Sequence, residues 1–325
     1  MKDECIRVTA PARLHFGMLS FENGRQRRFG GLGLMVERPA VRLHCTASRE
    51  FEVVGPLAER VRHVALNWSR WRSLDDLPPC RLEVRDAPQH HTGLGTGTQL
   101  GLAVAAGLNA LLLPDEATVT PAQLAAAVGR GHRSAVGTYG FHLGGLILES
   151  GKLPGDSIGR LEHRVAVPAT WQFALLRPLN DEGLSGGAED EAFALLKDAP
   201  ASTTERLGYL ARHVILPAAK RRRFDEFAEG VYDYGYLAGS CYASIQGGAF
   251  AGPQLTQLVR TIREIGVRGV GQTSWGPTVF AVLPDEGAAH RFADRIRSQY
   301  SPQELSVVVT RANNSGADIN CGPRK

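Results

Sequence analysis

The first third of the chain alternates hydrophobic and polar positions in short stretches rich in β-branched residues. These stretches predict strands at residues 6–9, 34–36, 41–45, 51–54 and 81–84. Between the last two, apolar side chains recur at three- and four-residue spacing, at Val61, Val64, Ala65, Trp68 and Trp71. This spacing predicts a helix over residues 57–71 that packs through one face.

Further along, an apolar pattern predicts a helix over about residues 98–112. Thr120 and Pro121 then have the sequence of an N-cap followed by proline at the first helical position, which predicts a second helix to about residue 130. Residues 134–145 are rich in glycine and polar groups, so we expect an irregular loop that could form the wall of a site. A strand is predicted at residues 146–149.

The pattern resets after the glycine-containing turn at residues 151–155, and we expect a domain boundary there or at a strand over residues 165–167. The second half predicts another mixture of helices and strands. Its expected strands are residues 171–176, 278–283 and 305–310, and its expected helices are residues 188–197, 203–216, 224–236, 254–265 and 286–300. With 325 residues, the chain suits two domains, which we place at residues 1–165 and 166–325.

Composition narrows the class of protein. An apolar share of 43% and a charged share of 22% are those of an ordinary globular chain. The net charge of +4 is small, and the basic runs at residues 25–28 and 220–223 are short and lack the aromatic stacking surfaces and finger motifs of nucleic-acid-binding modules. We therefore expect no nucleic-acid partner. A mildly basic site that faces a phosphorylated substrate fits the same charge.

Cysteine usage and hydropathy indicate a cytoplasmic protein. The cysteines are odd in number, far apart and without a Cys-x-x-Cys pair: Cys5, Cys45, Cys80, Cys241 and Cys321. No apolar run approaches the ~20 residues that span a bilayer, and the N-terminal residues lack a signal-peptide pattern. We expect reduced thiols and no membrane contact.

A glycine-rich stretch at residues 91–99 carries the strongest chemical signal. It follows a predicted strand and opens a predicted helix. Gly93, Gly95 and Gly97 permit turns whose amides converge on one anion, and the helix N-terminus adds partial positive charge. Thr96 and Thr98 could cap the helix or donate hydroxyls to phosphate. A plain glycine turn with a capping threonine is the alternative.

This loop resembles the second motif of the GHMP kinase superfamily. Residues 10–17, Ala-Pro-Ala-Arg-Leu-His-Phe-Gly, are similar to its N-terminal motif, and residues 269–278 stand where its C-terminal glycine-rich motif lies. The resemblance implies an α+β, two-domain fold. It has an N-terminal βαβ-type domain with the phosphate loop, a C-terminal ferredoxin-like domain, and a site between them.

The chain departs from the kinases of that superfamily. Where they carry Ser-Gly-x-Asp, this sequence has Ser134-Ala135-Val136-Gly137, without an aspartate to orient an acceptor hydroxyl. Its sequence resembles instead that of the β-ribofuranosylaminobenzene 5'-phosphate synthases, at residues 13–17, 28–33, 91–99 and 130–134. Those enzymes join a para-substituted benzoate to 5-phosphoribosyl diphosphate in tetrahydromethanopterin biosynthesis, releasing carbon dioxide and diphosphate. A small-molecule kinase and a non-catalytic metabolite binder are the alternatives.

The resemblance implies the following site residues. Those for phosphate are Gly93, Leu94, Gly95, Thr96, Gly97, Thr98 and Ser134. The candidate catalytic residues are Arg13, His15, Arg28 and Arg133. Arginine suits both carboxylate and diphosphate, so chemistry alone does not distribute these roles.

A second stretch, residues 180–187, resembles the acidic pair and glycine turn of phosphoribosyltransferases. The substrate-binding candidates come from this stretch and from the C-terminal glycine-rich motif: Asp181, Glu182, Ser185, Gly186, Gly187, Gln272, Thr273, Ser274 and Trp275. A solvated turn is the alternative for the first five, and a buried structural role is the alternative for Trp275. Mg²⁺ chelated by the diphosphate is the expected cofactor, with Asp181, Glu182 and Glu189 as candidate ligands. No zinc site and no redox or pyridoxal cofactor is expected, and the family implies a homodimer.

Overall fold

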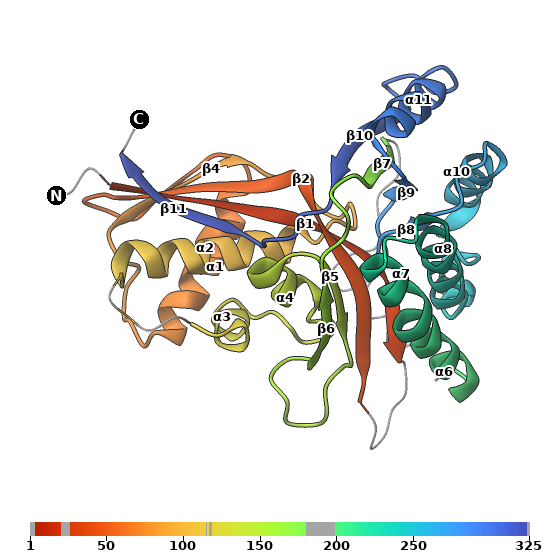
Figure 1. The fold of residues 1–325 in the computed structure, drawn as a ribbon. Coiled ribbons are helices and arrows are strands. Elements are labelled where there is room, and N and C mark those ends of the chain that lie inside the picture. The colour runs from red at the N-terminus through yellow and green to blue at the C-terminus, as the bar shows by residue number, and fades with distance from the viewer. Residues whose placement is uncertain (1–3, 21–26, 115, 117–118, 180–198, 324–325) are drawn as a thin grey trace.

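The computed structural model describes residues 4–20, 27–114, 116, 119–179 and 199–323. Helices and strands alternate, and the strands form two separate sheets (Figure 1). This confirms the α+β prediction. In the described part of the chain, no helix combines the length and the apolar character needed to cross a membrane.

Two long antiparallel strands organise the first sheet. Its strands are β1 (Glu4–Ser20), β2 (Phe29–Ala47), β3 (Glu52–Val54), β4 (Cys80–Asp86), β5 (Leu146–Glu149), β6 (Leu161–Val165) and β11 (Asp318–Pro323). The order is β11-β1-β2-β4-β3, and β5 pairs with both β2 and β6. The two strands predicted at residues 34–36 and 41–45 are parts of β2. The register shifts between them, because Pro11 pairs with Ala40 and Ala12 with Val36, so residues 37–39, Glu-Arg-Pro, form a bulge and not a turn.

Four helices belong to this first half: α1 (Ala58–Trp71), α2 (Thr96–Leu112), α3 (Pro121–Ala127) and α4 (Val136–Leu143). The apolar face predicted for α1 is buried at Val61, Val64, Ala65 and Trp68 and half-buried at Trp71. Trp68 donates a hydrogen bond from Nε1 to Asn109 Oδ1 at 2.9 Å. Thr120 forms the expected N-cap of α3, in a capping box with Gln123.

The loop predicted over residues 134–145 is wrong, because most of it is α4. Its glycines serve packing: a Cβ on Gly140 would lie 2.2 Å from Met35 Sδ, so only glycine lets the helix lie this close to β2. Gly144, with φ 58°, ends the helix. Glycine content indicated a loop where it in fact permits close contact between a helix and a sheet.

The second sheet has the ferredoxin-like order. Its strands are β7 (Gln172–Pro178), β8 (Val270–Gln272), β9 (Val279–Leu283) and β10 (Leu305–Arg311). All are antiparallel in the order β10-β7-β9-β8, which is the fourth, first, third and second strand of this unit. Its helical segments are α6 (Ala201–Tyr209), η1 (Leu210–Ile215), α7 (Leu216–Lys220), α8 (Phe224–Ser240), α9 (Ala243–Gln246), α10 (Gly252–Glu264) and α11 (Glu286–Arg297).

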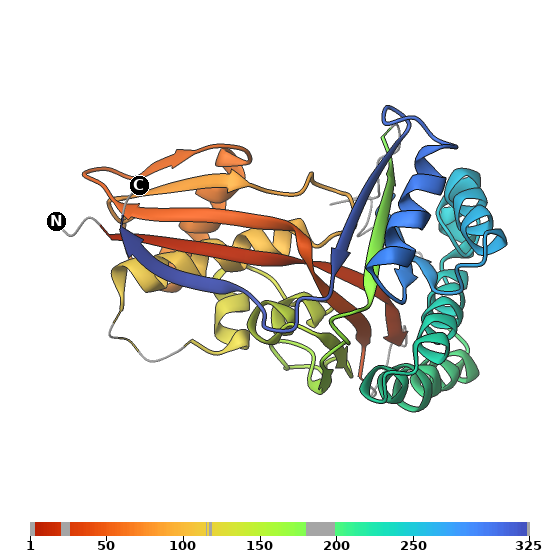
Figure 2. The ribbon, with the colours of Figure 1, turned by 45° about the horizontal axis from the view of Figure 1, so that its top comes forward.

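The chain returns to the first sheet at its end. Strand β11 pairs with β1 from Thr9 opposite Asp318 to Glu4 opposite Pro323, and Figure 2 shows this last strand, in blue, beside β1 in red. The division at residues 165 and 166 stays a prediction. The last strand, which that division assigns to the second half, is nevertheless part of the first sheet.

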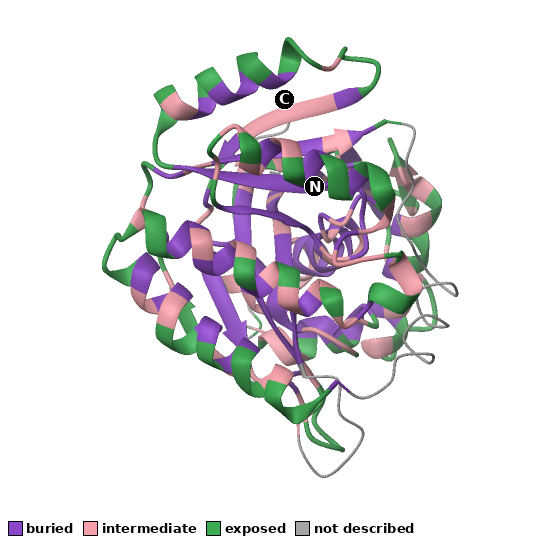
Figure 3. Ribbon diagram, turned by 90° about the vertical axis from the view of Figure 1, so that its right-hand side faces the viewer, coloured by how far each residue is buried: buried purple, intermediate pink, exposed green. Residues whose placement is uncertain are grey.

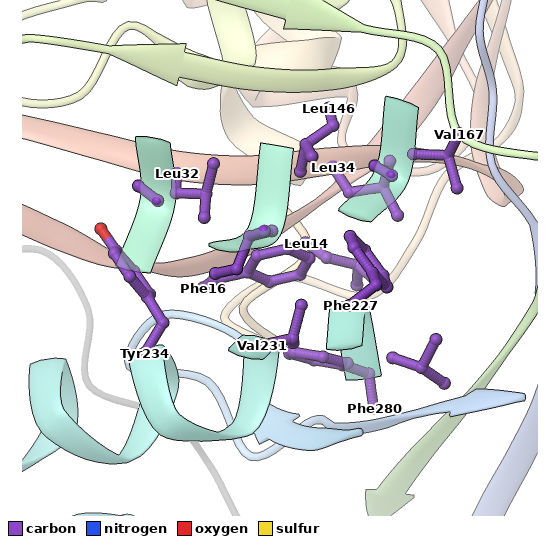
Figure 4. Packing of buried hydrophobic residues seen from close by; sticks show 14 of the residues in the cluster. Leu14, Phe16, Leu32, Leu34, Leu146, Val167, Phe227, Val231, Tyr234 and Phe280 are labelled. Atoms are coloured by element: carbon purple, nitrogen blue, oxygen red, sulfur yellow. The ribbon is translucent and has the colours of Figure 1, made fainter. Parts of the chain in front are cut away.

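The hairpin of β1 and β2 also reaches the second half. Phe16 on β1 packs on Phe280 of β9, with ring centroids 5.1 Å apart. Figure 4 shows Leu14 and Phe16 facing Phe227 and Val231 of α8, within one buried cluster. The surface helices are exposed on their outer sides and buried toward the sheets (Figure 3). One buried cluster therefore spans the joint between the two sheets.

We expect Phe16→Ala to lower the free energy of unfolding by about 3–5 kcal/mol, since it removes a buried ring at the joint between the sheets. Urea unfolding followed by circular dichroism measures the change. Leu153→Ala is the control, because Leu153 is 37% exposed, and we expect a change within about 0.5 kcal/mol. Equal effects of the two substitutions would contradict this account of the core.

Candidate functional site

A cleft of about 430 Å³ lies at the meeting of the two halves. One wall is the glycine loop before α2, and another is the segment from residue 129 to 134 before α4. The first strand contributes Arg13, His15 and Met18, and the turn between β8 and β9 contributes Ser274, Trp275 and Gly276. The motifs that are far apart in the sequence therefore line one space.

The glycine loop requires glycine at two positions. Gly93 and Gly95 have φ values of 82° and 72°, a region that disfavours other residues. Gly95 is the N-cap of α2, which begins at Thr96, two residues earlier than predicted. Thr96 is 5% exposed, and its hydroxyl has no hydrogen-bond partner among the described residues. A buried hydroxyl without a partner, at a helix N-terminus and on a residue that lines the cleft, is suited to an anion.

Thr273 fixes this loop to β1 and to the second sheet. Its Oγ1 accepts a hydrogen bond from the His15 amide at 2.9 Å and donates one to the Gly93 carbonyl at 2.9 Å. Thr273 is fully buried. A Cβ on Gly93 would lie 2.2 Å from the Thr273 carbonyl oxygen, so the two turns are in direct contact. One hydroxyl thus joins three segments of the site.

Cationic side chains lie beside the glycine loop at Gly95 and at Gly97. A Cβ on Gly97 would lie 2.6 Å from Arg60 Nη2 and 3.3 Å from Arg130 Nη2. A Cβ on Gly95 would lie 3.3 Å from Arg13 Nε. Burial first, and then the charge of Arg60, lowers the pKa of His90. Of the described residues that line the cleft, four are arginines, four are histidines and none is a carboxylate.

His15 is buried at the inner end of the cleft. Burial, and next the charge of Arg13, holds its pKa well below the usual range, so the ring is neutral at neutral pH. Its Nε2 lies 3.1 Å from Ser134 Oγ. Behind Ser134 lies the buried carboxyl of Glu149, which accepts hydrogen bonds from the amides of Ala135 at 3.1 Å and Gly151 at 2.9 Å. Burial raises the pKa of Glu149 to about 7.

A smaller, more apolar recess of about 50 Å³ adjoins the cleft. The two share His15, Met18, Ser274 and Trp275. Trp275 is 7% exposed and packs edge-to-face on Tyr242, with centroids 4.5 Å apart. Trp275 is therefore both a buried packing residue and part of the cleft wall.

The structure gathers most of the residues that the sequence analysis selected. Arg13, His15, Arg133, Ser134 and residues 93–98 line the cleft, with Ser274 and Trp275. Gln272 lines the recess, and Thr273 supports the glycine loop. Their roles toward a ligand stay predictions.

Other selected residues lie elsewhere. Arg28 is exposed, bridges to Lys152 through the backbone, stacks over Phe29 at 5.2 Å and is not among the residues that line the cleft. The candidates between residues 181 and 189 lie outside the described residues, as does the helix predicted at 188–197: Asp181, Glu182, Ser185, Gly186, Gly187 and Glu189.

Sequence reasoning missed several residues of the site. Arg60 belongs to a helix whose pattern indicates only packing, and nothing in its spacing marks the first-turn arginine that reaches the glycine loop. Arg130 belongs to the motif at residues 130–134, but the sequence analysis assigned it no role in the site, whereas the structure places it in the cleft lining. His90 is one of two adjacent histidines, a pattern that favours packing or capping, yet it lines the cleft. Glu149 ends an apolar strand. A lone carboxylate at such a position is rarely buried without a partner, so it could have marked Glu149 as a functional or structural residue.

We expect Thr273→Val to destabilise the protein, because it leaves the buried His15 amide and Gly93 carbonyl without a partner. The cost is about 1–3 kcal/mol for each group. Thr273→Ser keeps the hydroxyl and is the matched control. Urea unfolding gives the free energy of unfolding of both variants, and the difference measures the two hydrogen bonds of the Thr273 hydroxyl. Equal free energies would show that the hydroxyl contributes nothing to stability.

The raised pKa of Glu149 predicts a pH dependence of stability. The unfolded chain loses this proton near pH 4.5 and the folded chain near pH 7, so between these values the folded state holds one more proton. The contribution of Glu149 to the free energy of unfolding is therefore complete below pH 4.5. It falls by about 3 kcal/mol as the pH rises to 7. Urea unfolding of the wild type and Glu149→Gln over this range measures it. A constant difference between the two would refute the shift.

The chain matches known proteins in sequence along its whole length. A family model described as the GHMP kinases C-terminal domain matches residues 215–302. The chain is 26% identical to a β-ribofuranosylphenol 5'-phosphate synthase of Methanothermobacter thermautotrophicus, covering 95% of this chain and 97% of that protein. It is 25% identical to one of Archaeoglobus fulgidus, covering 97% and 99%.

Solved structures of a small-molecule kinase and of a decarboxylase share the fold. A homoserine kinase from Cytophaga hutchinsonii superposes with a TM-score of 0.66 at 17% identity, covering 98% of each chain. A mevalonate pyrophosphate decarboxylase from Streptococcus pyogenes gives 0.67 at 12% identity, covering 95% of this chain and 97% of that one. The chain therefore shares the fold of these proteins, its residues 215–302 match the GHMP kinases C-terminal model, and along its length it resembles the β-ribofuranosylphenol 5'-phosphate synthases.

Proposed function

We propose that the protein is a pentosyltransferase that joins the ribose 5-phosphate unit of 5-phosphoribosyl diphosphate to a para-substituted benzoate, with release of carbon dioxide and diphosphate. The observation that carries this proposal is the charge of the cleft. Its described lining combines a helix N-terminus with four arginines and contains no carboxylate. Such a site favours a ligand with several negative charges.

The arrangement of these charges suits a donor with two anionic ends. Arg60 and Arg130 lie beside Gly97, whereas Arg13 lies beside Gly95. A 5-phosphoribosyl diphosphate molecule carries a phosphate at one end of the sugar and a diphosphate at the other. We assign one end to Arg60 and Arg130 and the other end to Arg13, and we propose that the Thr96 hydroxyl, which has no hydrogen-bond partner among the described residues, donates to a phosphate oxygen.

The apolar recess gives the acceptor a place beside the donor. A benzoate has a flat apolar ring, which suits the surface of Met18 and Trp275 where the recess meets the cleft. The curated relatives are named for a phenol product. Because a phenol product requires a para-hydroxyl group, 4-hydroxybenzoate is the first acceptor to test, and 4-aminobenzoate is the second.

The reaction requires little proton transfer by the protein. The bond from ribose C1 to the diphosphate breaks and its electron pair leaves with the diphosphate. The ring carbon that bears the carboxylate bonds to C1, and the carboxylate then leaves as carbon dioxide and returns its electron pair to the ring. The para donor stabilises the intermediate, so we propose no redox or pyridoxal cofactor. Arginines would stabilise the departing diphosphate.

Magnesium would enter with the donor. The described residues of the cleft offer a cation hydroxyl oxygens, such as those of Thr96, Thr98 and Ser134, but no carboxylate. Mg²⁺ keeps several waters and is commonly held by substrate phosphates with few protein ligands. We therefore propose that the diphosphate supplies its main ligands, and that the ion neutralises charge on the leaving group.

An ATP-dependent kinase is the second candidate, and it is favoured by the fold alone. The cleft lacks a carboxylate among its described lining that could orient an acceptor hydroxyl. Incubation with magnesium and ATP separates the candidates: transfer of the γ-phosphate to an alcohol would favour the kinase. Tight binding of 5-phosphoribosyl diphosphate without turnover would favour a non-catalytic binder.

With magnesium and 5-phosphoribosyl diphosphate, we expect the protein to release labelled carbon dioxide from carboxyl-labelled 4-hydroxybenzoate or 4-aminobenzoate. The para donor should be essential, since it carries the positive charge that develops in the ring. Unsubstituted benzoate is the matched control and should release none. A folded protein that binds the donor but decarboxylates neither substrate would overturn the proposed reaction.

Thr96→Ala and Arg133→Ala should weaken use of the donor more than use of the acceptor. Each loses a hydrogen bond to a charged group, worth about 1.5–3 kcal/mol, which is roughly a 10- to 150-fold fall in kcat/KM for 5-phosphoribosyl diphosphate. Arg297→Ala, at the exposed end of α11, is the control. An unchanged kcat/KM in both cleft variants would place the donor elsewhere.

A further inference from the structure

One end of the glycine loop adjoins the wall that the cleft shares with the apolar recess. A Cβ on Gly93 would lie 2.2 Å from the carbonyl oxygen of Thr273 and 3.0 Å from the Cα of Gly276, so this end of the loop contacts the turn between β8 and β9. That turn and β1 supply the residues that line both the cleft and the recess: His15, Met18, Ser274 and Trp275. The recess is therefore on the Gly93 side of the loop.

The other end of the loop adjoins two arginines. A Cβ on Gly97 would lie 2.6 Å from Arg60 Nη2 and 3.3 Å from Arg130 Nη2, so both guanidinium groups reach the same point of the loop. Both residues line the cleft, and neither is among the described residues that line the recess. This pair of arginines is therefore at the end of the loop that is remote from the recess.

Arg13 lies beside the middle of the loop. A Cβ on Gly95 would lie 3.3 Å from Arg13 Nε, and the Arg13 amide donates a hydrogen bond to the Leu94 carbonyl at 2.9 Å. Along β1, Arg13 is two residues from His15, which lines both the cleft and the recess. The neighbours of the loop therefore follow one another as the wall of the recess, Arg13, and the pair of arginines.

Arg60 is a half-buried cation in a position that favours an anion. Among the described residues it makes no hydrogen bond and no ion pair, and burial lowers its pKa. It belongs to the first turn of α1 and lies against Gly97 in the first turn of α2, so the positive ends of two helices are close to it. A charge in such surroundings is costly without a partner, and a ligand phosphate would provide one.

We propose that Arg60 and Arg130 form a subsite for the 5-phosphate of the donor, and that the diphosphate lies beside Arg13. This assignment rests on the proposed function. In that reaction the acceptor ring bonds to ribose C1, the atom that carries the diphosphate, and the ring lies where the recess meets the cleft. The diphosphate is therefore the end nearer to the recess, and the 5-phosphate extends along the loop to Gly97.

The subsite gives the protein a means to select its donor. The bond that breaks is at C1, so the 5-phosphate keeps its charge throughout the reaction, and Arg60 binds donor and product alike. Arg60 is therefore a specificity-determining residue and not a group that stabilises the departing diphosphate. It should contribute to the affinity for a ligand with a phosphate on the 5-hydroxyl, and little to the affinity for diphosphate.

Calorimetric titration with ribose 5-phosphate, and separately with magnesium diphosphate, tests the assignment without an acceptor. We expect Arg60→Gln to weaken binding of ribose 5-phosphate by roughly 10- to 100-fold and binding of diphosphate by less than about threefold. Arg13→Gln should show the opposite selectivity. Arg62→Gln is the matched control and should change neither affinity, because Arg62 is exposed on the same helix, stacks over Phe51 at 5.3 Å and does not line the cleft.

A larger effect of Arg60→Gln on diphosphate than on ribose 5-phosphate would reverse the orientation and overturn the proposal. Equal effects on the two ligands, or no effect on either, would overturn it as well. The wild type gives a second test that needs no substitution. With separate subsites, ribose 5-phosphate and diphosphate bind together, and mutual exclusion of the two ligands would contradict the assignment.

The subsite and the reaction fail separately. If Arg60→Gln is selective for ribose 5-phosphate but the wild type releases no carbon dioxide from either benzoate, the phosphate subsite stands and the proposed reaction fails. If the wild type releases carbon dioxide and Arg60→Gln shows no selectivity, the reaction stands and the subsite fails. A wild type that binds neither ribose 5-phosphate nor 5-phosphoribosyl diphosphate would overturn both.

Discussion

The structure depends on the antiparallel pairing of β1 with β2. These strands pair from Cys5 opposite Thr46 to Ser20 opposite Phe29, and so extend from the first sheet to the second. One part of β1 packs under α2, another carries Phe16 to Phe280, and the part between carries Arg13 and His15 into the cleft. Because one strand supplies both the joint and the site, the geometry of the cleft is tied to the packing of both halves.

Local sequence patterns predicted most elements and failed where tertiary contacts decide. The face of α1 and the cap of α3 follow from periodicity and capping chemistry, which are local. The continuity of β2 depends on a bulge opposite Pro11, and α4 depends on a glycine that fits Met35. Neither contact has a local signature. The return of β11 to β1 joins the two ends of the chain, and no spacing in the sequence marks it.

The site divides in the same way. The glycine loop and Arg13 could be found because motif residues and their helix N-terminus are consecutive or match a family pattern. Arg60 and Glu149 come from elements whose pattern is explained by packing, and their place in the site emerges only from the fold. Arg28 belonged to a matching motif, yet it lies outside the cleft lining, because the turn that carries it pairs with Lys152.

Two kinds of electrostatic arrangement meet in the cleft. Arginines lie beside Gly95 and Gly97, and the described lining of the cleft holds no carboxylate, so the cleft favours an anionic ligand. Behind them, His15 stays neutral and Glu149 titrates near neutral pH, because both are buried. The outer groups suit charge neutralisation, whereas burial governs the protonation of the inner groups.

The central claim is that this cleft binds one ligand with two separate anionic ends. Calorimetric titration in the presence of magnesium tests it most directly, with 5-phosphoribosyl diphosphate, ribose 5-phosphate, diphosphate and ATP as ligands. The account predicts that 5-phosphoribosyl diphosphate binds more tightly than ATP, and that ribose 5-phosphate and diphosphate each displace it. Tighter binding of ATP, with no measurable binding of 5-phosphoribosyl diphosphate, would contradict it.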